Sequence, residues 1–449
     1  MRPSSINRRL SIASVSVLLC LLGFAGLGLA SQPFAPGFGS SGVAETPLPA
    51  DDRQLIFELG QGPIVSDLAV TPRGGLVAAV GSGTENEFFA AAGFRAGGDL
   101  DERFGSGGFV RARIFPSLVR HNEPQAEGVA VQRDGKIVLV GYRRGIASRT
   151  PAPVVIRLLP SGRPDRGFAQ QGLISPKPDG ARADVLRDVA IQPSGRIVAV
   201  GGRNERDRKA VQVKRPAGLV VAYRPDGRID RSFGSGGRVL FSGRKARYSF
   251  TGLTDLAVLA SGKILVTGYR NSRLLVARLG VSGKLDRSFG GGDGMVSFGL
   301  GRRNLCCPEE ASLVALAGGG SVVLTDGFSP VLMVRLRADG GLDRRFGRQG
   351  ILNANPQRLP GMLDVAVQGD GRIVAVGQGK KGFTVLRFKP NGQRDRSFGR
   401  RGITTLPRGL ASVAASAATL PNGRVVVGGG AQYQRNDRLE YSLLLAQLR

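Results

Sequence analysis

The sequence predicts an all-β protein, because three short patterns recur along it in a fixed order. The first places an Asp three residues before a Phe, usually as D-R-S-F-G, at Asp101 and Phe104, Asp165 and Phe168, Asp230 and Phe233, Asp286 and Phe289, Asp343 and Phe346, and Asp395 and Phe398. Successive Phe positions lie 64, 65, 56, 57 and 52 residues apart. The second pattern is a pair of apolar segments around a Gly turn, and the third is a Pro-Asp-Gly or Pro-Asn-Gly turn. A repeat of this length is one supersecondary unit that buries its apolar face against its neighbours.

Each repeat contains four candidate strands. In the second unit these are residues 108–115, 128–132, 136–142 and 154–159, which are short alternating or β-branched segments. The second and third strands are joined by tight turns in which Gly supplies a positive φ, at Gly135, Gly195, Gly262, Gly371 and Gly423. We therefore interpret these glycines as turn residues and not as a phosphate-binding loop.

Counting the fourth strands gives seven units, which start near residues 54, 108, 172, 237, 294, 350 and 402. Seven four-stranded repeats of about 50–67 residues predict a seven-bladed β-propeller. An open β-solenoid is the alternative, but its terminal units would need polar caps that the sequence lacks. If residues 54–60 form the first strand and 443–449 the last, every blade is contiguous in sequence. If the starting point of the units is shifted by one strand, the ring would instead close by swapping, with a strand from one end of the chain completing the blade formed by the other end.

The recurring motifs resemble those of the delta-60 repeat family of predicted β-propellers. The resemblance rests on residues 129–141, 189–201 and 365–377, on L-D-R-S-F-G at 285–290 and on R-P-D-G at 224–227, and it extends over roughly residues 54–449. Three departures are that no D-x-x-F precedes the first unit, that the turn at 318–320 is loosened, and that the seventh unit ends at its last strand. The resemblance implies a fold and no activity.

The N-terminus predicts export. Residues 1–30 have the form of a signal peptide, with Arg2, Arg8 and Arg9 before an apolar segment at about 12–29 and a small-x-Ala site at 28–30. An uncleaved anchor is the alternative, and Cys20 gives weak support to a lipoprotein because Leu precedes it. We expect 31–53 to be a flexible Gly/Pro/Ser-rich leader and 54–449 to be the propeller, secreted or at the cell surface, with no membrane span after cleavage.

The repeated Phe and Asp predict structural roles. A Phe that recurs at one place in each unit is expected to pack between adjacent blades. Arg157, Arg278, Arg335 and Arg387 each stand eight residues before the Asp of their unit, so an Arg–carboxylate pair in each blade is expected. One carboxylate per unit lacks the dense oxygen spacing of a calcium loop, so no metal site is predicted.

Strand parity predicts where binding residues gather. The loops between first and second strands and between third and fourth strands emerge on one face, and these loops carry most of the unrepeated residues. Our candidate binding residues on that face are Arg120, His121, Glu123, Arg244, Lys245, Tyr248, Arg302, Arg303, Lys380 and Lys381.

Catalytic signals are sparse, and no catalytic residue or cofactor is predicted. His121 is the only histidine, which argues against a His-based metal cluster or a Ser-His-Asp triad. The alternative function is a hydrolase of anionic glycans or esters that uses loop carboxylates such as Glu85, Glu123 and Glu309. The vicinal Cys306 and Cys307 would form either a local disulfide or two free thiols in an exported protein.

The charge favours an acidic partner. The formal net charge of +29 becomes about +26 when the three signal-region arginines are removed, although a solvated basic surface is the simpler interpretation. The absence of Trp and the six Tyr disfavour nucleic acid as a partner. The sequence therefore predicts an exported, noncatalytic and monomeric binding scaffold for an anionic cell-surface polymer or a protein.

Overall fold

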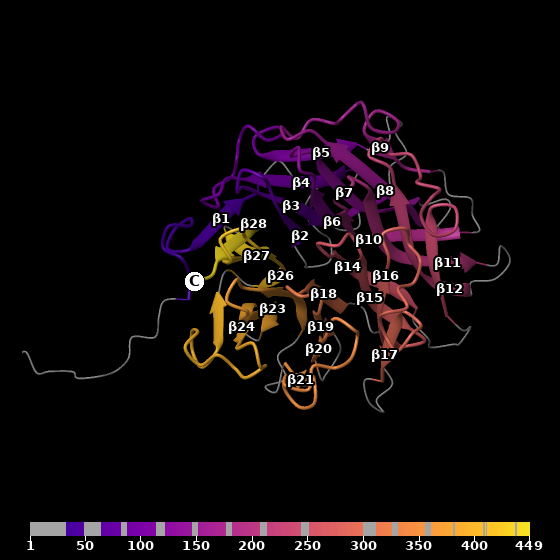
Figure 1. Cartoon of the computed structure of the whole chain (residues 1–449). Coiled ribbons are helices and arrows are strands. Elements are labelled where there is room, and N and C mark those ends of the chain that lie inside the picture. The colour runs from indigo at the N-terminus through magenta and orange to yellow at the C-terminus, as the bar shows by residue number, and fades with distance from the viewer. Residues whose placement is uncertain are drawn as a thin grey trace, which may run out of the picture.

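The computed structural model describes residues 33–48, 64–81, 88–113, 122–145, 151–176, 182–206, 213–243, 251–299, 311–325, 331–354, 361–379, 382–406, 409, 411–435 and 438–449. These residues form seven four-stranded antiparallel sheets, which are arranged about a common centre as the blades of a propeller (Figure 1). Within the described ranges, no helix is long and apolar enough to cross a membrane. The predicted seven-bladed all-β fold is confirmed.

The first four blades follow one another along the chain. Blade 1 contains β2 (Ile64–Val70), β3 (Leu76–Gly81), β4 (Phe88–Phe94) and β5 (Phe109–Arg113). Blade 2 contains β6 (Asn122–Val131), β7 (Ile137–Gly145), β8 (Pro151–Leu158) and β9 (Leu173–Ile174). Blade 3 contains β10 (Arg182–Ile191), β11 (Ile197–Arg206), β12 (Val213–Tyr223) and β13 (Arg238–Ser242). Blade 4 contains β14 (Gly252–Val258), β15 (Ile264–Arg270), β16 (Arg273–Leu279) and β17 (Met295–Phe298).

The remaining three blades complete the ring. Blade 5 contains β18 (Ala311–Ala315), β19 (Ser321–Thr325), β20 (Leu332–Leu336) and β21 (Ile351–Asn353). Blade 6 contains β22 (Met362–Val367), β23 (Ile373–Gly379), β24 (Gly382–Phe388) and β25 (Ile403–Leu406). Blade 7 contains β26 (Ala411–Thr419), β27 (Val425–Arg435), β28 (Arg438–Gln447) and, from the other end of the chain, β1 (Val43–Pro47).

The blade boundaries differ from those predicted for an arrangement in which every blade is contiguous in sequence. The segment expected to open the second unit, 108–115, contains β5, which pairs with β4 and so is the outermost strand of blade 1. The units predicted to start near 172, 237, 294, 350 and 402 are displaced in the same way by one strand. The ring closes by the swapped arrangement, because β1 pairs with β28 as the outermost strand of blade 7.

The expectation of a flexible leader at 31–53 is therefore wrong for residues 33–48. β1 pairs with β28 and buries Val43, Ala44 and Thr46, whereas Glu45 and Pro47 are exposed. The Gly, Pro and Ser content of the segment concealed this strand. Residues 49–63, which include the predicted strand at 54–60, lie outside the described residues.

The N-terminal segment also contains a seventh copy of the motif, at Ala35–Pro36–Gly37–Phe38–Gly39. The Phe38 amide donates to the Ala35 carbonyl and the Gly42 amide to the Phe38 carbonyl, which are the bonds that Phe104 forms with Asp101 and Gly108 with Phe104. Phe38 is buried like its counterparts. Ala35 occupies the position of the Asp, and for that reason a search for D-x-x-F missed this copy.

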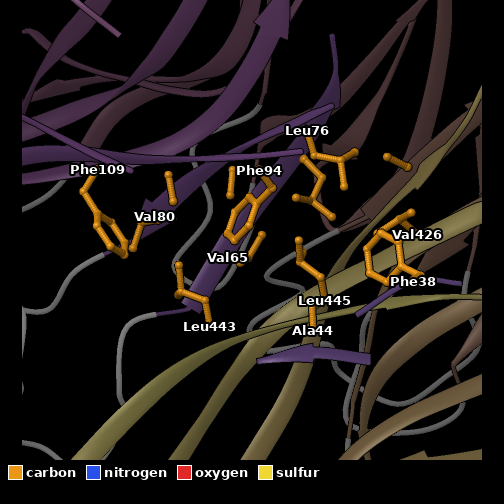
Figure 2. Close-up of a cluster of buried hydrophobic side chains, with 14 of the residues drawn as sticks. Phe38, Ala44, Val65, Leu76, Val80, Phe94, Phe109, Val426, Leu443 and Leu445 are labelled. Carbon is orange, nitrogen blue, oxygen red and sulfur yellow. The ribbon is translucent and has the colours of Figure 1, made fainter. Parts of the chain in front are cut away.

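The hydrophobic core consists of seven clusters, each shared by two adjacent blades. The cluster at the closure joins Phe38 and Ala44 of the N-terminal segment to side chains of blade 1 and to Leu443 and Leu445 of β28 (Figure 2). The N-terminal segment thus contributes to the same apolar core as the strands that it joins, and its burial stabilises the closed ring.

Candidate functional site

The two faces of the propeller differ in regularity. In every blade the chain runs from the innermost strand through a tight turn to the second strand, and in blades 1 to 6 it runs from the third strand through the D-x-x-F step to the outermost strand. Because the strands are antiparallel, these turns and steps share one face, which we call the regular face. The opposite strand ends, which we call the variable end, flank the segments outside the described residues.

Most candidate binding residues cannot be placed in this structure. Outside the described residues lie Arg120, His121, Arg244, Lys245, Tyr248, Arg302, Arg303, Lys380, Lys381, Cys306 and Cys307. The backbone of Glu123 lies in β6 at the variable end. The strand ends that flank the candidates, such as Arg113 and Asn122, also lie at that end, in agreement with the parity argument.

The repeated Phe and Asp form a buried cluster in each step. Phe104, Phe168, Phe233, Phe289, Phe346 and Phe398 all have at most 5% of their surface exposed. The expected Arg–Asp pairs are present, with Nε–Oδ2 distances of 2.9 Å for Arg157–Asp165, 2.7 Å for Arg278–Asp286, 3.1 Å for Arg335–Asp343 and 2.8 Å for Arg387–Asp395.

Each of these arginines also connects two blades. The Arg157 guanidinium lies 4.5 Å from the centre of the Phe168 ring, close enough for a cation–π interaction. The same side chain donates to the Pro225 carbonyl of blade 3. Arg335 donates to the Pro390 carbonyl at 2.6 Å and Arg387 to the Arg449 carbonyl at 2.7 Å. The Arg–Asp–Phe cluster therefore fixes each step against the next blade.

The Phe side chains also define the packing between steps and turns. A Cβ added to Gly227, which has a φ of +89°, would lie 2.8 Å from Phe168 Cε2. Gly227 is the last residue of the R-P-D-G turn in blade 3. The repeated Gly is therefore required both by its left-handed backbone and by the Phe of the preceding blade.

In blade 3 the motif Asp is paired with an arginine from a different position in the repeat. Ala222 stands where blades 2, 4, 5 and 6 have an Arg, and Arg196, in the turn before β11, instead contacts Asp230 at 2.6 Å. The Arg196 guanidinium lies 5.7 Å from the centre of the Phe233 ring. Hydrogen bonds from Ser232 and Arg196 lower the pKa of Asp230.

The residue directly after each motif Asp does not belong to the Arg–Asp–Phe cluster, because its side chain is exposed. Five consecutive blades carry an exposed arginine there, which together we call the arginine arc: Arg166, Arg231, Arg287, Arg344 and Arg396. Within the described residues none of the five forms an ion pair or a side-chain hydrogen bond. The arc ends at blades 7 and 1, where Pro36 and Glu102 hold the same position.

The central channel contains a second repeated feature that the motif search did not identify. Six innermost strands have a β-bulge at the same level, at Ser66, Glu127, Arg187, Thr254, Leu363 and Ala415. The next residues along the chain, together with Ser312 of β18, form what we call the clasp ring: Asp67, Gly128, Asp188, Asp255, Ser312, Asp364 and Ser416. The bulge residues and all of the clasp ring except Gly128 line a cavity of about 330 Å³.

The clasp ring joins neighbouring innermost strands. Asp67 Oδ2 accepts a hydrogen bond from the Val129 amide of blade 2 at 2.8 Å, and Asp188 Oδ2 accepts one from Leu256 of blade 4 at 3.0 Å. Asp364 Oδ2 accepts one from Ala417 of blade 7 at 2.7 Å. Asp255 bonds the Leu313 amide of blade 5 in the same way. Each aspartate thus satisfies an amide of the next blade.

Burial raises the pKa of the four channel aspartates. Desolvation is the largest cause in each case, and it raises the pKa of Asp67 to about 6 and that of Asp364 to about 7. The pKa of Asp188 is raised well above its usual range by desolvation and by the neighbouring Asp255, with which it shares a hydrogen bond. Desolvation also raises the pKa of Asp255.

These carboxylates have structural partners and not an open coordination site. Ser312 Oγ and the Val365 amide both donate to Asp364 Oδ1, and the Ala417 amide donates to Asp364 Oδ2. Among the described residues no group of three or more His, Cys, Asp or Glu side chains is placed to hold a metal ion. The sequence signal for the clasp ring is the Asp directly before the apolar segment of the innermost strand in four of the repeats, as in D-V-A-I at 188–191.

Comparison with known proteins agrees with the fold. A family model described as a β-propeller domain of unknown function (DUF5122) matches residues 132–168, 259–289 and 368–398. Each matched segment begins after an innermost strand and ends at a motif Phe. The chain is therefore a β-propeller repeat protein. A search of curated proteins by sequence gives no match.

Several solved structures are similar at low identity. A puromycin hydrolase variant is 16% identical with a TM-score of 0.46, covering 87% of this chain and 53% of the hydrolase, so the chain spans about half the length of that protein. A protein of unknown function from Dyadobacter fermentans is 10% identical with a TM-score of 0.43, covering 90% and 99% of the two chains. A sialidase from Streptococcus pneumoniae is 11% identical with a TM-score of 0.41, covering 90% and 71%.

Proposed function

We propose that this propeller is an exported, noncatalytic scaffold of the delta-60 repeat type that binds an extended anionic polysaccharide at or outside the cell surface. The arginine arc is the observation that supports this function. Export rests on the signal-peptide pattern at 1–30, and the repeat type rests on the recurring motifs described above.

The arc presents positive charge that the fold does not use. The motif aspartates beside it are held by other cations, as Asp165 is by Arg157 and Asp395 by Arg387. Each arc arginine is therefore an exposed cation beside a neutralised carboxylate. Exposed guanidinium groups bind carboxylates and sulfates through paired hydrogen bonds, which suits the acidic groups of such a polymer.

The geometry favours an extended ligand over a compact one. The five arginines belong to five consecutive blades and follow the ring from blade 2 to blade 6. A small anion would contact one of them, whereas a polymer can contact several at once and gain affinity from each. The lack of Trp in the chain favours a polysaccharide over a single-stranded nucleic acid.

The hydrolase alternative gains no support from the described carboxylates. Those in the channel accept hydrogen bonds from backbone amides of neighbouring blades, so they contribute to the structure of the ring. Glu85 and Glu309 lie outside the described residues.

The test compares two charge-matched variants for binding to polygalacturonate and to dextran sulfate. One replaces the five arc arginines with Gln. The control replaces five cations of the same face that already pair with local acids: Arg95, Arg103, Lys136, Arg228 and Arg337. We expect the arc variant to lose most binding and the control to retain it, with wild-type binding weakening steeply between about 0.01 M and 0.1 M salt.

A gain-of-function variant sharpens the test. Glu102→Arg would extend the arc to blade 1 and is expected to strengthen binding to both polymers. Equal losses in the two charge-matched variants would show that binding depends on net charge alone, and the proposal would then be wrong.

A further inference from the structure

A pocket between blades 2 and 3 has a local cause in the sequence. β9 is only two residues long, whereas the outermost strands β5 and β13 have five residues each. Val155 pairs with Ile174, so continuation of the ladder would place Pro153 opposite Pro176. Neither proline has an N–H to donate, and β9 therefore ends early.

The short strand leaves part of blade 3 uncovered. The resulting pocket has a volume of about 410 Å³, within the range of small-molecule sites. Blade 2 contributes Pro151, Pro153 and Ile174 to its wall, and blade 3 contributes Leu219 and Val221. Leu240, which pairs with Leu219 on the same face of the sheet, is 44% exposed. An exposed leucine beside an apolar pocket extends the apolar surface available to a ligand.

The walls of the pocket are fixed by hydrogen bonds. Arg143 donates to Ser175 Oγ at 2.8 Å and to the Pro176 carbonyl at 3.1 Å, which holds the chain after β9 in place. Arg203 donates to both carboxylate oxygens of Asp184, at 2.8 and 2.6 Å. The bidentate pair neutralises the Asp184 charge, so this carboxylate does not make the pocket acidic.

Two polar side chains of the pocket have no partner among the described residues. Tyr223 is 6% exposed, and its hydroxyl makes no hydrogen bond there. Burial raises the pKa of Tyr223 to about 12, so the hydroxyl remains a donor at physiological pH. Arg238 of β13 forms no ion pair in the described structure and lies close enough to Tyr223 to affect its titration.

With Asp184 and Arg203 paired, Arg238 gives the pocket a net charge of about +1. A ligand that satisfies both free groups needs an anionic oxygen for Arg238 and Tyr223, and an apolar body for the Pro, Ile, Leu and Val surface. We propose that this pocket binds a small organic anion of that kind, a carboxylate on an aliphatic or aromatic body. Gly227 and Ile229 of the blade 3 step also line the pocket, but no arginine of the arc does.

The test uses decanoate as the probe and decanol as its uncharged counterpart, with isothermal titration calorimetry on the full chain. Decanoate is expected to bind one site more tightly than decanol. Arg238→Gln should weaken decanoate by roughly tenfold or more and leave decanol unchanged, because it removes a charged hydrogen-bond partner. Tyr223→Phe should weaken decanoate by a smaller factor.

A filling variant and a surface control complete the design. Ala152 is buried in the pocket wall, and Ala152→Leu should weaken both probes while the far-UV spectrum and the thermal midpoint confirm folding. Arg396→Gln, which removes the arc arginine of blade 6, should leave both affinities unchanged. The proposal is overturned if decanoate does not bind, if it binds no better than decanol, or if folded Ala152→Leu binds it as well as the wild type. None of these outcomes affects the polysaccharide test.

Discussion

Replacing Asp364 with Ser is expected to remove a large part of the pH dependence of stability. The substitution is suggested by the protein itself, because Ser312 and Ser416 occupy the same clasp-ring position in blades 5 and 7. A serine hydroxyl there accepts the hydrogen bond from the next blade, as Ser312 Oγ does from the Val365 amide at 3.3 Å. The variant therefore keeps a hydrogen-bond acceptor for the next blade but loses the titrating carboxyl group.

The magnitude follows from the raised pKa. Desolvation and the charge of Asp255 raise the pKa of Asp364 from 3.8 to about 7, so the folded protein retains a proton that the unfolded chain releases. The stability that this proton confers is present below the unfolded pKa and is lost as the pH rises through the folded pKa. From about pH 5 to about pH 8 the loss is about 2–3 kcal/mol, at about 1.36 kcal/mol for each pH unit over which the folded state holds the extra proton.

Urea denaturation followed by far-UV circular dichroism measures this effect. Wild-type protein should have a higher midpoint at about pH 5 than at about pH 8, and Asp364→Ser should show a smaller difference, with Asp188 and Asp255 contributing to the part that remains. Asp67, whose pKa is raised to about 6, should account for part of what remains. The control is Asp370→Ser, which removes an exposed carboxylate of the same blade and should keep the wild-type difference. A wild-type midpoint that rises from pH 5 to pH 8, or an unchanged difference in Asp364→Ser, would refute the reasoning.

Three other predictions concern the motif clusters. Phe233→Ala should destabilise the fold by about 3–5 kcal/mol, as expected for a buried aromatic, whereas Arg231→Ala should change stability by about 0.5 kcal/mol or less; equal denaturation midpoints would contradict the buried role of the Phe. Phe38→Ala should cost as much as Phe233→Ala, and a midpoint like that of the wild type would show that the N-terminal copy is dispensable. Asp286→Asn should lower stability more at neutral pH than near pH 3, because hydrogen bonds from Lys263 and Ser288 lower the pKa of Asp286, and the resulting stability is lost as pH falls through that pKa; equal losses at both pH values would contradict this assignment.

The sequence was sufficient for the features that depend on period and spacing. The number of blades follows from the recurrence of the motif, and the Arg157–Asp165 pair follows from an eight-residue separation that recurs in three other blades. Such features are local, so one repeat predicts the next. The face assignment has the same basis, because antiparallel strands alternate in direction whichever strand is counted first.

The features that were missed depend on how the chain is paired in space. Whether residues 108–115 begin one blade or end the previous one is decided by the partner of β5, and both choices give the same sequence period. The bulge that precedes six of the seven clasp positions is also invisible in the sequence, because it is a mismatch between two strands in which two residues oppose one. Asp188 and Asp255 consequently looked like ordinary polar residues of exposed strand positions.

The closure of the ring explains why the arginine arc is incomplete. The seventh motif copy lies in the N-terminal segment, where Ala35 replaces the Asp and Pro36 the exposed Arg. Without the Asp this step has no Arg–carboxylate pair, so β1 is held by its ladder with β28 and by the apolar contacts of Phe38. The adjacent position in blade 1 is Glu102, which adds a negative charge beside the closure. In the proposed binding mode, a polyanion that follows the arc would contact blades 2 to 6 and stop before blade 1 and before blade 7, in which the two ends of the chain pair. Binding along the arc would then involve no contact with β1, the strand that closes the ring.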